Sequence, residues 1–242
     1  MSPASGERAA GASGWQAGAR AGASAPAWAL LGAVVLLGLV SDLASKWLAF
    51  GKVAGSPVAV LRSDVLAAQR AGVPIQALVP THAPVRVVPG LLDLTLVLNP
   101  GAVFGVGAGR RVLFVAFTAL AVSGALALFA RGTGPRDRWT HVGLGLVVAG
   151  GLGNLYDRVV YACVRDFIHP LPKVRFPWGL DPLSNGGEVW PYVSNVADLH
   201  LLVGVGILVV VLGRSGGGRA LAGTPEGAGA GAAEAAASGP GA

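Results

Sequence analysis

Charged residues are scarce in this chain of 242 residues, and cysteine is nearly absent. Asp, Glu, Lys and Arg make up 12% of the residues, hydrophobic residues make up 53%, and the mean hydropathy is +0.62. A soluble domain carries about 25% charged residues, so this composition indicates an integral membrane protein. The single cysteine, Cys163, excludes an internal disulfide framework and a cysteine-based zinc cluster, and its apolar context favours a packing role.

Other functional signatures are missing too. The net charge is +6, but the basic residues are scattered, which disfavours nucleic acid as a partner and favours membrane lipids. The four histidines show no HExxH or comparable spacing. Neither a Gly-x-Ser-x-Gly motif nor a cysteine with a nearby histidine is present. We therefore expect no metal or other cofactor, and no serine or cysteine nucleophile.

Four apolar runs dominate the chain, each near the length of about 17–25 residues that crosses a bilayer. They lie at about 27–50, 112–130, 139–162 and 196–213. The first run is longer than a signal-peptide core and lacks a small-x-small cleavage site, which favours a retained helix. The Ala-, Gly- and Ser-rich segments 1–25 and 214–242 are predicted to be disordered tails. The expected fold is a mainly α integral membrane protein whose four transmembrane helices occupy residues 26–213.

Basic residues near the ends of the runs predict the orientation. The loop between the second and third helices and the two tails carry Arg131, Arg136, Arg138, Arg8, Arg20, Arg214 and Arg219. An even number of spans places these regions on one side, which we predict to be cytoplasmic, although Arg110 and Arg111 give an opposing signal. The connections 51–111 and 163–195 then face outward.

One element of the outward connections has a clear pattern. In the stretch 91–98, leucine occupies every second position, which predicts an amphipathic strand. Beside membrane helices, its apolar face is expected to rest on the lipid surface. The segments 51–90 and 168–191 show no pattern that assigns a structure.

Two aspartates, Asp166 and Asp198, lie where an apolar run meets an outer connection. Ionisable groups at membrane depth are costly, so two of them in such places predict a shared functional site. The alternative for Asp198 is helix capping, although Asn195 is the better cap candidate. Two close carboxylates share a proton and can activate water while polarising a scissile carbonyl, as an aspartyl protease does. A small transporter or proton channel could use the same carboxylates as a relay.

Polar residues near the end of the third run extend this candidate site. Asn154 and Arg158 share a helix face, and the neighbouring Asp157 is expected to neutralise Arg158 and to be mainly structural. The glycines in 150–153 are expected to let helices pack closely.

Two more pairs stand outside the third run. Asp42 and Lys46 are spaced to pair on the first helix, either as a plain ion pair or to order the site. Asn99 and Gly101 follow the predicted strand, where they form a turn or present an amide to a substrate.

Together these residues resemble the motifs of the lipoprotein signal peptidases, also called type II signal peptidases. The matches are Asp42-x-x-Ser-Lys46, Asn99-x-Gly-x-x-Phe-Gly105, Gly150-Gly-x-Gly-Asn154-x-x-Asp157-Arg158, Val164-x-Asp166-Phe-Ile168 and Asn195-Val-Ala-Asp198. The resemblance implies a four-helix peptidase of the bacterial inner membrane with a small extracytoplasmic β-cradle. It also implies cleavage of diacylglyceryl-modified prolipoproteins just before the lipidated cysteine, without a metal.

The resemblance implies a role for each matching residue. Asp166 and Asp198 match the catalytic pair of the family. The positions expected to bind substrate or order the site are Asn99, Gly101, Asn154, Arg158 and Asn195. Asp42, Lys46 and Asp157 are expected to give structural support. Globomycin-like peptides block this site in the family.

The chain departs from the family pattern at a few positions. Leu43 replaces a glutamine, Ser194 replaces a common aromatic residue and Arg165 replaces an apolar residue, and the outer connections are longer than typical.

Two rival functions are the carboxylate relay of a transporter or channel and a non-catalytic scaffold. A transporter would more naturally show an internal repeat, and the sequence has none. We expect a monomer.

Overall fold

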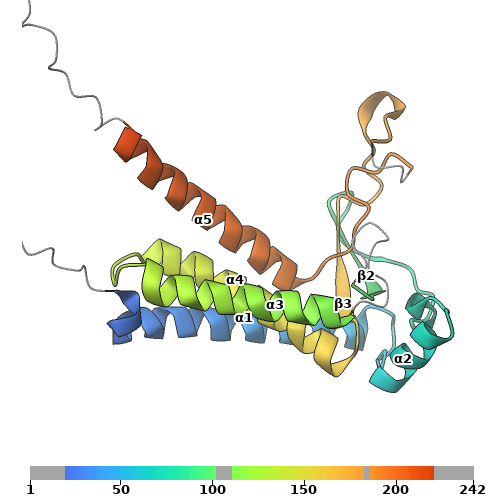
Figure 1. Cartoon of the computed structure of the whole chain (residues 1–242). Helices are drawn as coiled ribbons and strands as arrows, with labels where there is room; N and C mark the ends of the chain where they lie inside the picture. Colours follow the sequence, from blue (N-terminus) through green and yellow to red (C-terminus); the bar gives the residue numbers. More distant parts are fainter. Residues whose placement is uncertain (1–19, 102–110, 183–185, 221–242) are drawn as a thin grey trace, which may run out of the picture.

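The computed structural model describes residues 20–101, 111–182 and 186–220, in which long helices form the body of the molecule (Figure 1). The long helices are α1 (Ala25–Lys52), α3 (Arg111–Gly132), α4 (Arg138–Val160) and α5 (Val196–Ala220). The shorter elements are η1 (Ala21–Ala23), α2 (Arg62–Arg70), η2 (Ile75–Leu78), β1 (Val85–Val88), β2 (Leu92–Asn99), β3 (Val164–Pro170) and η3 (Pro177–Gly179). The strands and α2 gather at one end of the bundle, beyond the C-terminal end of α1.

Three helices in the described part of the chain are long and apolar enough to cross a membrane. They are Ala25–Lys52, Val112–Gly132 and Val196–Arg214. α4 has 23 residues, which is a sufficient length, but it does not meet the same criterion of composition. Its sequence includes several glycines and the polar residues Asn154, Asp157 and Arg158. The prediction of four spanning helices is therefore supported for three of them.

α4 contacts α1, α3 and α5, and its glycines allow this central position. A Cβ atom on Gly150 would collide with the carbonyl oxygen of Ala197 in α5, and one on Gly153 would collide with the carboxylate of Asp42 in α1. The prediction that the glycines in 150–153 permit close helix packing is confirmed. As a result, α1, α4 and the start of α5 meet at one place.

The three strands form an antiparallel sheet in the order β1-β2-β3. β2 confirms the strand predicted from the leucine alternation at 91–98. Its register with β3 pairs Val97 with Asp166 and Asn99 with Val164. This register brings the end of β2 beside Asp166, although the two segments are far apart in the sequence.

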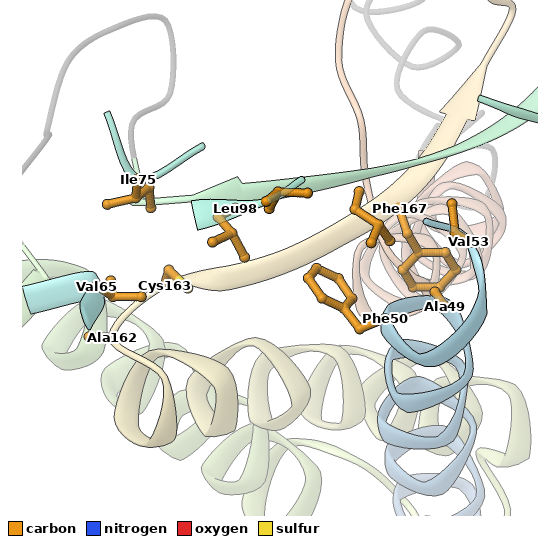
Figure 2. Close-up of a cluster of buried hydrophobic side chains, with 11 residues drawn as sticks. Ala49, Phe50, Val53, Val65, Ile75, Leu98, Ala162, Cys163 and Phe167 are labelled. Carbon is orange, nitrogen blue, oxygen red and sulfur yellow. The ribbon is translucent and has the colours of Figure 1, made fainter. Parts of the chain in front are cut away.

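One face of β2 and β3 packs into a hydrophobic core beneath the sheet (Figure 2). Leu96 and Leu98 are 1% and 3% exposed, and they share this core with Phe50 of α1, Val65 of α2 and Ile75 of η2. The prediction that the apolar face of the strand rests on lipid is therefore wrong. Segment 51–90, which has no clear sequence pattern, folds over that face and buries the leucines in protein instead.

Side chains bond β2 beyond Leu94, where its pairing with β1 stops. The Gln76 amide donates to the carbonyl oxygen of Leu96 and accepts from the backbone N–H of Leu98, both at 3.0 Å. His82 Nε2 accepts from the backbone N–H of Leu96 at 3.2 Å. These bonds satisfy backbone groups that a further strand would otherwise have to pair.

The ends of the helices differ modestly from the predicted boundaries. Residues 21–23 form η1, and Ser24 caps α1 through its Oγ, which accepts from the backbone N–H of Ala27 at 3.4 Å. α5 continues to Ala220 instead of ending at 213. Adding residues to an existing helix needs no new nucleation, so the helix can extend through glycines although each costs about 1 kcal/mol. The rest of the predicted tails, residues 1–19 and 221–242, lies outside the described residues.

Candidate active site

Asp166 lies in β3, not at the end of a helix as its place after an apolar run suggested. α4 ends at Val160, and Ala162 has a left-handed backbone (φ 62°) where the chain turns into the strand. Ala162, Cys163 and Val164 are all buried, so the apolar run continues through the turn. Hydrophobicity alone therefore does not reveal the change from helix to strand.

Asp198 lies in the first turn of α5 and exchanges hydrogen bonds with Asn195, which precedes the helix. The Asn195 Oδ1 accepts from the backbone N–H of Asp198, and the Asp198 Oδ2 accepts from the backbone N–H of Asn195, both at 3.1 Å. This reciprocal arrangement is a capping box. Helix capping, the alternative to a functional role, is thus present, but it leaves the second oxygen of Asp198 for a contact with α4.

The side-chain amides of Asn195 and Asn154 connect the two aspartates. Asn195 Nδ2 donates to Asp166 Oδ1 at 2.6 Å and to Asn154 Oδ1 at 3.1 Å. Asn154 Nδ2 in turn donates to Asp198 Oδ1 at 2.7 Å. Both hydrogens of the Asn195 amide are used, which determines how that side chain is oriented. The structure therefore joins four of the predicted site residues in one hydrogen-bonded group.

Asp166 is 1% exposed, and both of its carboxyl oxygens accept hydrogen bonds. Asn195 donates to Oδ1, and Asn99 Nδ2 donates to Oδ2 at 3.1 Å. Burial and the charge of Asp198 raise the pKa of Asp166 to about 7, although the bonds from Asn195 and Asn99 and the charge of Lys46 lower it. Asp166 is thus a carboxyl group that can hold a proton near neutral pH.

Asn99 reaches Asp166 from the turn that ends β2. Its Oδ1 accepts from the backbone N–H of Gly101 at 2.9 Å, so the turn directs the amide nitrogen toward the carboxyl group. Gly101 has φ 92°, and a Cβ atom there would lie 3.0 Å from the Phe114 ring. Glycine is required at this position on both grounds. The remainder of this motif, residues 102–105, lies outside the described residues.

Four buried charges lie next to this group: Asp42, Lys46, Asp157 and Arg165, none more than 7% exposed. Lys46 Nζ is 2.8 Å from Asp42 Oδ2 and 3.3 Å from Asp157 Oδ2. Arg165 Nη2 is 2.8 Å from Asp157 Oδ1, and the Arg165 backbone N–H donates to Asp157 Oδ2 at 2.9 Å. Two acids and two bases balance in this cluster, which we call the four-charge cluster.

The four-charge cluster also contacts the segments that carry the aspartate pair. Asp42 Oδ1 accepts from the backbone N–H of Ala197, in the first turn of α5, at 2.8 Å. Lys46 Nζ donates to Asn154 Oδ1 at 3.4 Å. Of the two interpretations of Asp42 and Lys46, a plain ion pair or an ordering role, these contacts favour the ordering role.

Arg158 does not pair with its neighbour Asp157, which corrects the prediction that the two neutralise each other. Adjacent residues on a helix point about 100° apart, so Asp157 joins the four-charge cluster while Arg158 faces elsewhere. The Arg158 guanidinium lies 5.6 Å from the centre of the Phe114 ring, and its Nη1 donates to the carbonyl oxygen of Asn154 at 3.2 Å. Its Nε is buried without a hydrogen-bond partner among the described residues.

The pairing of Arg165 with Asp157 is not visible in the sequence, where the two residues are eight positions apart. Neighbouring side chains of a strand point to opposite faces, so Arg165 turns away from Asp166. Its guanidinium lies 4.1 Å from the ring centre of Tyr161 and 5.9 Å from that of Phe50. The signal in the sequence that could have indicated this pair is an arginine within an apolar stretch, because a buried positive charge requires a buried acid as its partner.

The cysteine and the possible metal ligands form no second candidate site among the described residues. Cys163 is 1% exposed, and burial raises its pKa to about 12, so its thiol stays protonated and the packing prediction is confirmed. Within residues 20–101, 111–182 and 186–220, no three His, Cys, Asp or Glu side chains are grouped so that they could hold a metal ion.

Comparison with solved structures supports the fold. One bacterial membrane enzyme, solved by the in meso method at 2.3 Å resolution, aligns with a TM-score of 0.53 at 19% identity and covers 83% of this chain and 95% of its own. A second, solved at 1.9 Å resolution by the same method, aligns with a TM-score of 0.54 at 20% identity and covers 76% and 92%. At these identities the likeness concerns the fold alone.

Comparison of sequences identifies the family. A lipoprotein signal peptidase of Desulfitobacterium hafniense is 35% identical over 129 residues, which are 53% of this chain and 73% of the relative. Another, of Symbiobacterium thermophilum, is 37% identical over 131 residues, which are 54% and 76%. The family model described as signal peptidase (SPase) II matches residues 34–213. The chain therefore belongs to the signal peptidase II family, as its motifs predicted.

Proposed function

We propose that this chain is an intramembrane aspartyl endopeptidase that removes the signal peptide of diacylglyceryl-modified prolipoproteins, cutting before the lipidated cysteine. Membership of the signal peptidase II family makes it a bacterial membrane protease that processes lipoprotein signal peptides. The observation that carries the aspartyl mechanism is the link from Asp166 through Asn195 and Asn154 to Asp198. A carboxylate relay for transport has no comparable support, because the family relatives are peptidases.

The proposed reaction uses the two carboxyl groups in opposite protonation states. Asp166 holds the shared proton and donates it toward the scissile carbonyl oxygen, while Asp198 accepts a proton from the attacking water. The water oxygen bonds to the carbonyl carbon and gives a tetrahedral diol. The C–N bond then breaks, the leaving nitrogen takes the proton held by Asp198, and a hydroxyl proton of the diol returns to Asp166 as the new carboxyl group forms. The raised pKa of Asp166 supports this assignment.

Arg158 and Asn99 are proposed to bind the substrate backbone. Arg158 is a cation without an acidic partner among the described residues, and its Nε has no hydrogen-bond partner there. Its guanidinium is near enough to both aspartates to interact with their charges. A carbonyl oxygen of the substrate backbone could accept the hydrogen bond that Arg158 Nε does not make among the described residues. Gly101 and Asn195 are proposed to order the site, and globomycin-like peptides to compete for it.

We also propose that α4 is the fourth membrane span, since it lies against three helices that are apolar enough to cross. The arginines of the loop between α3 and α4 favour a cytoplasmic location for that loop and for both termini. The aspartate pair then faces the outer side of the inner membrane. A monomer carries every residue of the proposed site.

The proposed substrate predicts a specific dependence on lipidation. The purified chain, reconstituted in vesicles, should cleave a prolipoprotein that carries a diacylglyceryl cysteine at least about a hundredfold faster than the same precursor with a free cysteine. Cleavage should persist with EDTA or 1,10-phenanthroline, and mass spectrometry should place the cut directly before the lipidated residue. Equal rates for both precursors would contradict the substrate, and loss of activity that zinc restores would contradict the mechanism.

The position of Asp166 predicts the pH dependence of cleavage. As the pH rises above about 7, Asp166 of the substrate-free enzyme loses its proton, so kcat/KM should fall. The Asn99 amide stabilises the charged form, so Asn99→Ala should raise the pKa of Asp166 and move the fall in kcat/KM upward by about one pH unit. Gln76→Ala, which changes a residue that bonds the same strand away from the site, is the control and should leave the midpoint unchanged. An unchanged midpoint in Asn99→Ala would show that Asp166 does not cause the loss of activity at high pH.

A further inference from the structure

The end of the bundle opposite the aspartate pair contains a cavity of about 490 Å³ that the proposed reaction does not use. It lies where α1 and α4 begin, far from β3 (Figure 1). Its lining includes Pro26, Ala27, Leu30, Arg136, Arg138 and His141, and we call it the basic cavity. Its volume is within the range of about 300–1,000 Å³ typical of small-molecule sites.

His141 is the buried polar residue of the basic cavity. Its side chain is fully buried, and its Nε2 lies 3.2 Å from the hydroxyl of Thr133. That hydroxyl donates its only hydrogen to the carbonyl oxygen of Phe129 at 2.7 Å, so it can only accept from His141. In the neutral imidazole, Nε2 therefore carries the hydrogen, and Nδ1 is an acceptor. Nδ1 has no hydrogen-bond partner in the described part of the chain, so a ligand that donates a hydrogen bond to Nδ1 would satisfy it.

The charge around the basic cavity favours an anion. Arg136 and Arg138 line it, while the acid between them, Asp137, accepts a hydrogen bond from the backbone N–H of Gly134 at 2.7 Å. α1 and α4 both begin here, and the N-terminal end of a helix carries a partial positive charge. Two guanidinium groups and two helix ends together suit a phosphate.

The surroundings place the basic cavity at the edge of the membrane. Trp28 and Trp139, in the first turns of α1 and α4, are 42% and 69% exposed, and tryptophan is enriched at the level of lipid headgroups. Leu30 lies on α1, which is a candidate membrane span, and Leu37, two turns further along, is 70% exposed, so the apolar wall of the cavity leads onto a surface that can face lipid. A ligand with acyl chains fits this position better than a soluble phosphate.

We propose that the basic cavity binds an anionic phospholipid of the phosphatidylglycerol type. Its phosphate contacts Arg136 and Arg138. A small shift of the His141 ring, which is closed to solvent in this structure, lets a headgroup hydroxyl donate to Nδ1. Its acyl chains lie along α1 past Leu30. Phosphatidylethanolamine fits less well, because its ammonium group would lie beside two arginines.

Native mass spectrometry of the full chain in detergent tests this proposal by titration with short-chain lipids. Phosphatidylglycerol should bind more tightly than phosphatidylcholine, and about fivefold more tightly than phosphatidylmethanol, which has the same charge but no hydroxyl. Glycerol phosphate, which lacks acyl chains, should not bind measurably. Arg136→Gln/Arg138→Gln should raise the Kd for phosphatidylglycerol about thirtyfold.

The matched control is Arg131→Gln/Arg214→Gln, which removes the same charge from exposed positions that do not line the basic cavity. Its Kd should stay within about threefold of the parent. An equal loss in both double variants would mean diffuse attraction and would overturn the site. Equal affinity for phosphatidylglycerol and phosphatidylmethanol would overturn the hydroxyl contact, and tight binding of glycerol phosphate would overturn the lipid.

Discussion

Asp166→Asn and Asp198→Asn should each reduce cleavage of a lipoprotein precursor by about four orders of magnitude. An amide can neither accept the proton of the attacking water nor supply one to the scissile carbonyl, so either change removes half of the proposed pair. Both oxygens of each carboxyl group accept hydrogen bonds, so each variant also places an amide NH₂ against a donor. Some loss of stability is expected as well, and the amount of folded protein must be measured together with activity.

The measurement is precursor processing in cells depleted of their own prolipoprotein peptidase, with the variants expressed one at a time. Asp93→Asn is a suitable control, because Asp93 is a carboxyl group of the same sheet, 7% exposed and paired across the strands with His169. It lies outside the hydrogen-bonded group of the site and should retain most of the activity. Substantial processing by either Asp166→Asn or Asp198→Asn would refute the catalytic pair.

The second large effect should appear in stability, when Asp157 is changed. Asp157→Asn leaves Lys46 and Arg165 buried with only Asp42 to balance them, and an uncompensated buried charge costs about 3–5 kcal/mol. The temperature at which the solubilised protein loses its fold should therefore drop sharply.

A double variant distinguishes charge balance from simple loss of contacts. Asp157→Asn/Arg165→Met removes one acid and one base, so Lys46 and Asp42 again balance. It should be more stable than Asp157→Asn alone, although it has lost one more polar side chain. Losses that simply add across Asp157→Asn, Arg165→Met and the double variant would show that charge balance does not hold this cluster together.

The sequence predicted those parts of the fold that depend on hydrophobic pattern. The long apolar runs predicted α1, α3 and α4 to within two residues at each end and α5 at its start, and the alternating leucines predicted β2. Segment 51–90 remained unassigned because α2, η2 and β1 are short, and short elements take their structure from packing rather than from their own periodicity. Asp166 was associated with a helix because the buried turn at Ala162 extends the apolar run.

The candidate site was predictable as a set of residues but not as a set of contacts. Asn154, Asn195 and the two aspartates were all named from sequence, and the structure brings them together. Which acid pairs with which base was not predictable, because partners such as Asp157 and Arg165 depend on how β3 returns to α4. The neighbouring position of Asp157 and Arg158 in the sequence suggested a pair that helix geometry rules out.

The bonds from Gln76 and His82 to β2 have a consequence for shortened versions of the protein. Deleting segment 51–90 would uncover the backbone groups of Leu96 and Leu98 together with their side chains. An uncovered hydrophobic strand edge is a template on which a second molecule can add its own strand. A trimmed variant is therefore expected to form aggregates through β2, even where the membrane helices and the aspartate pair are untouched.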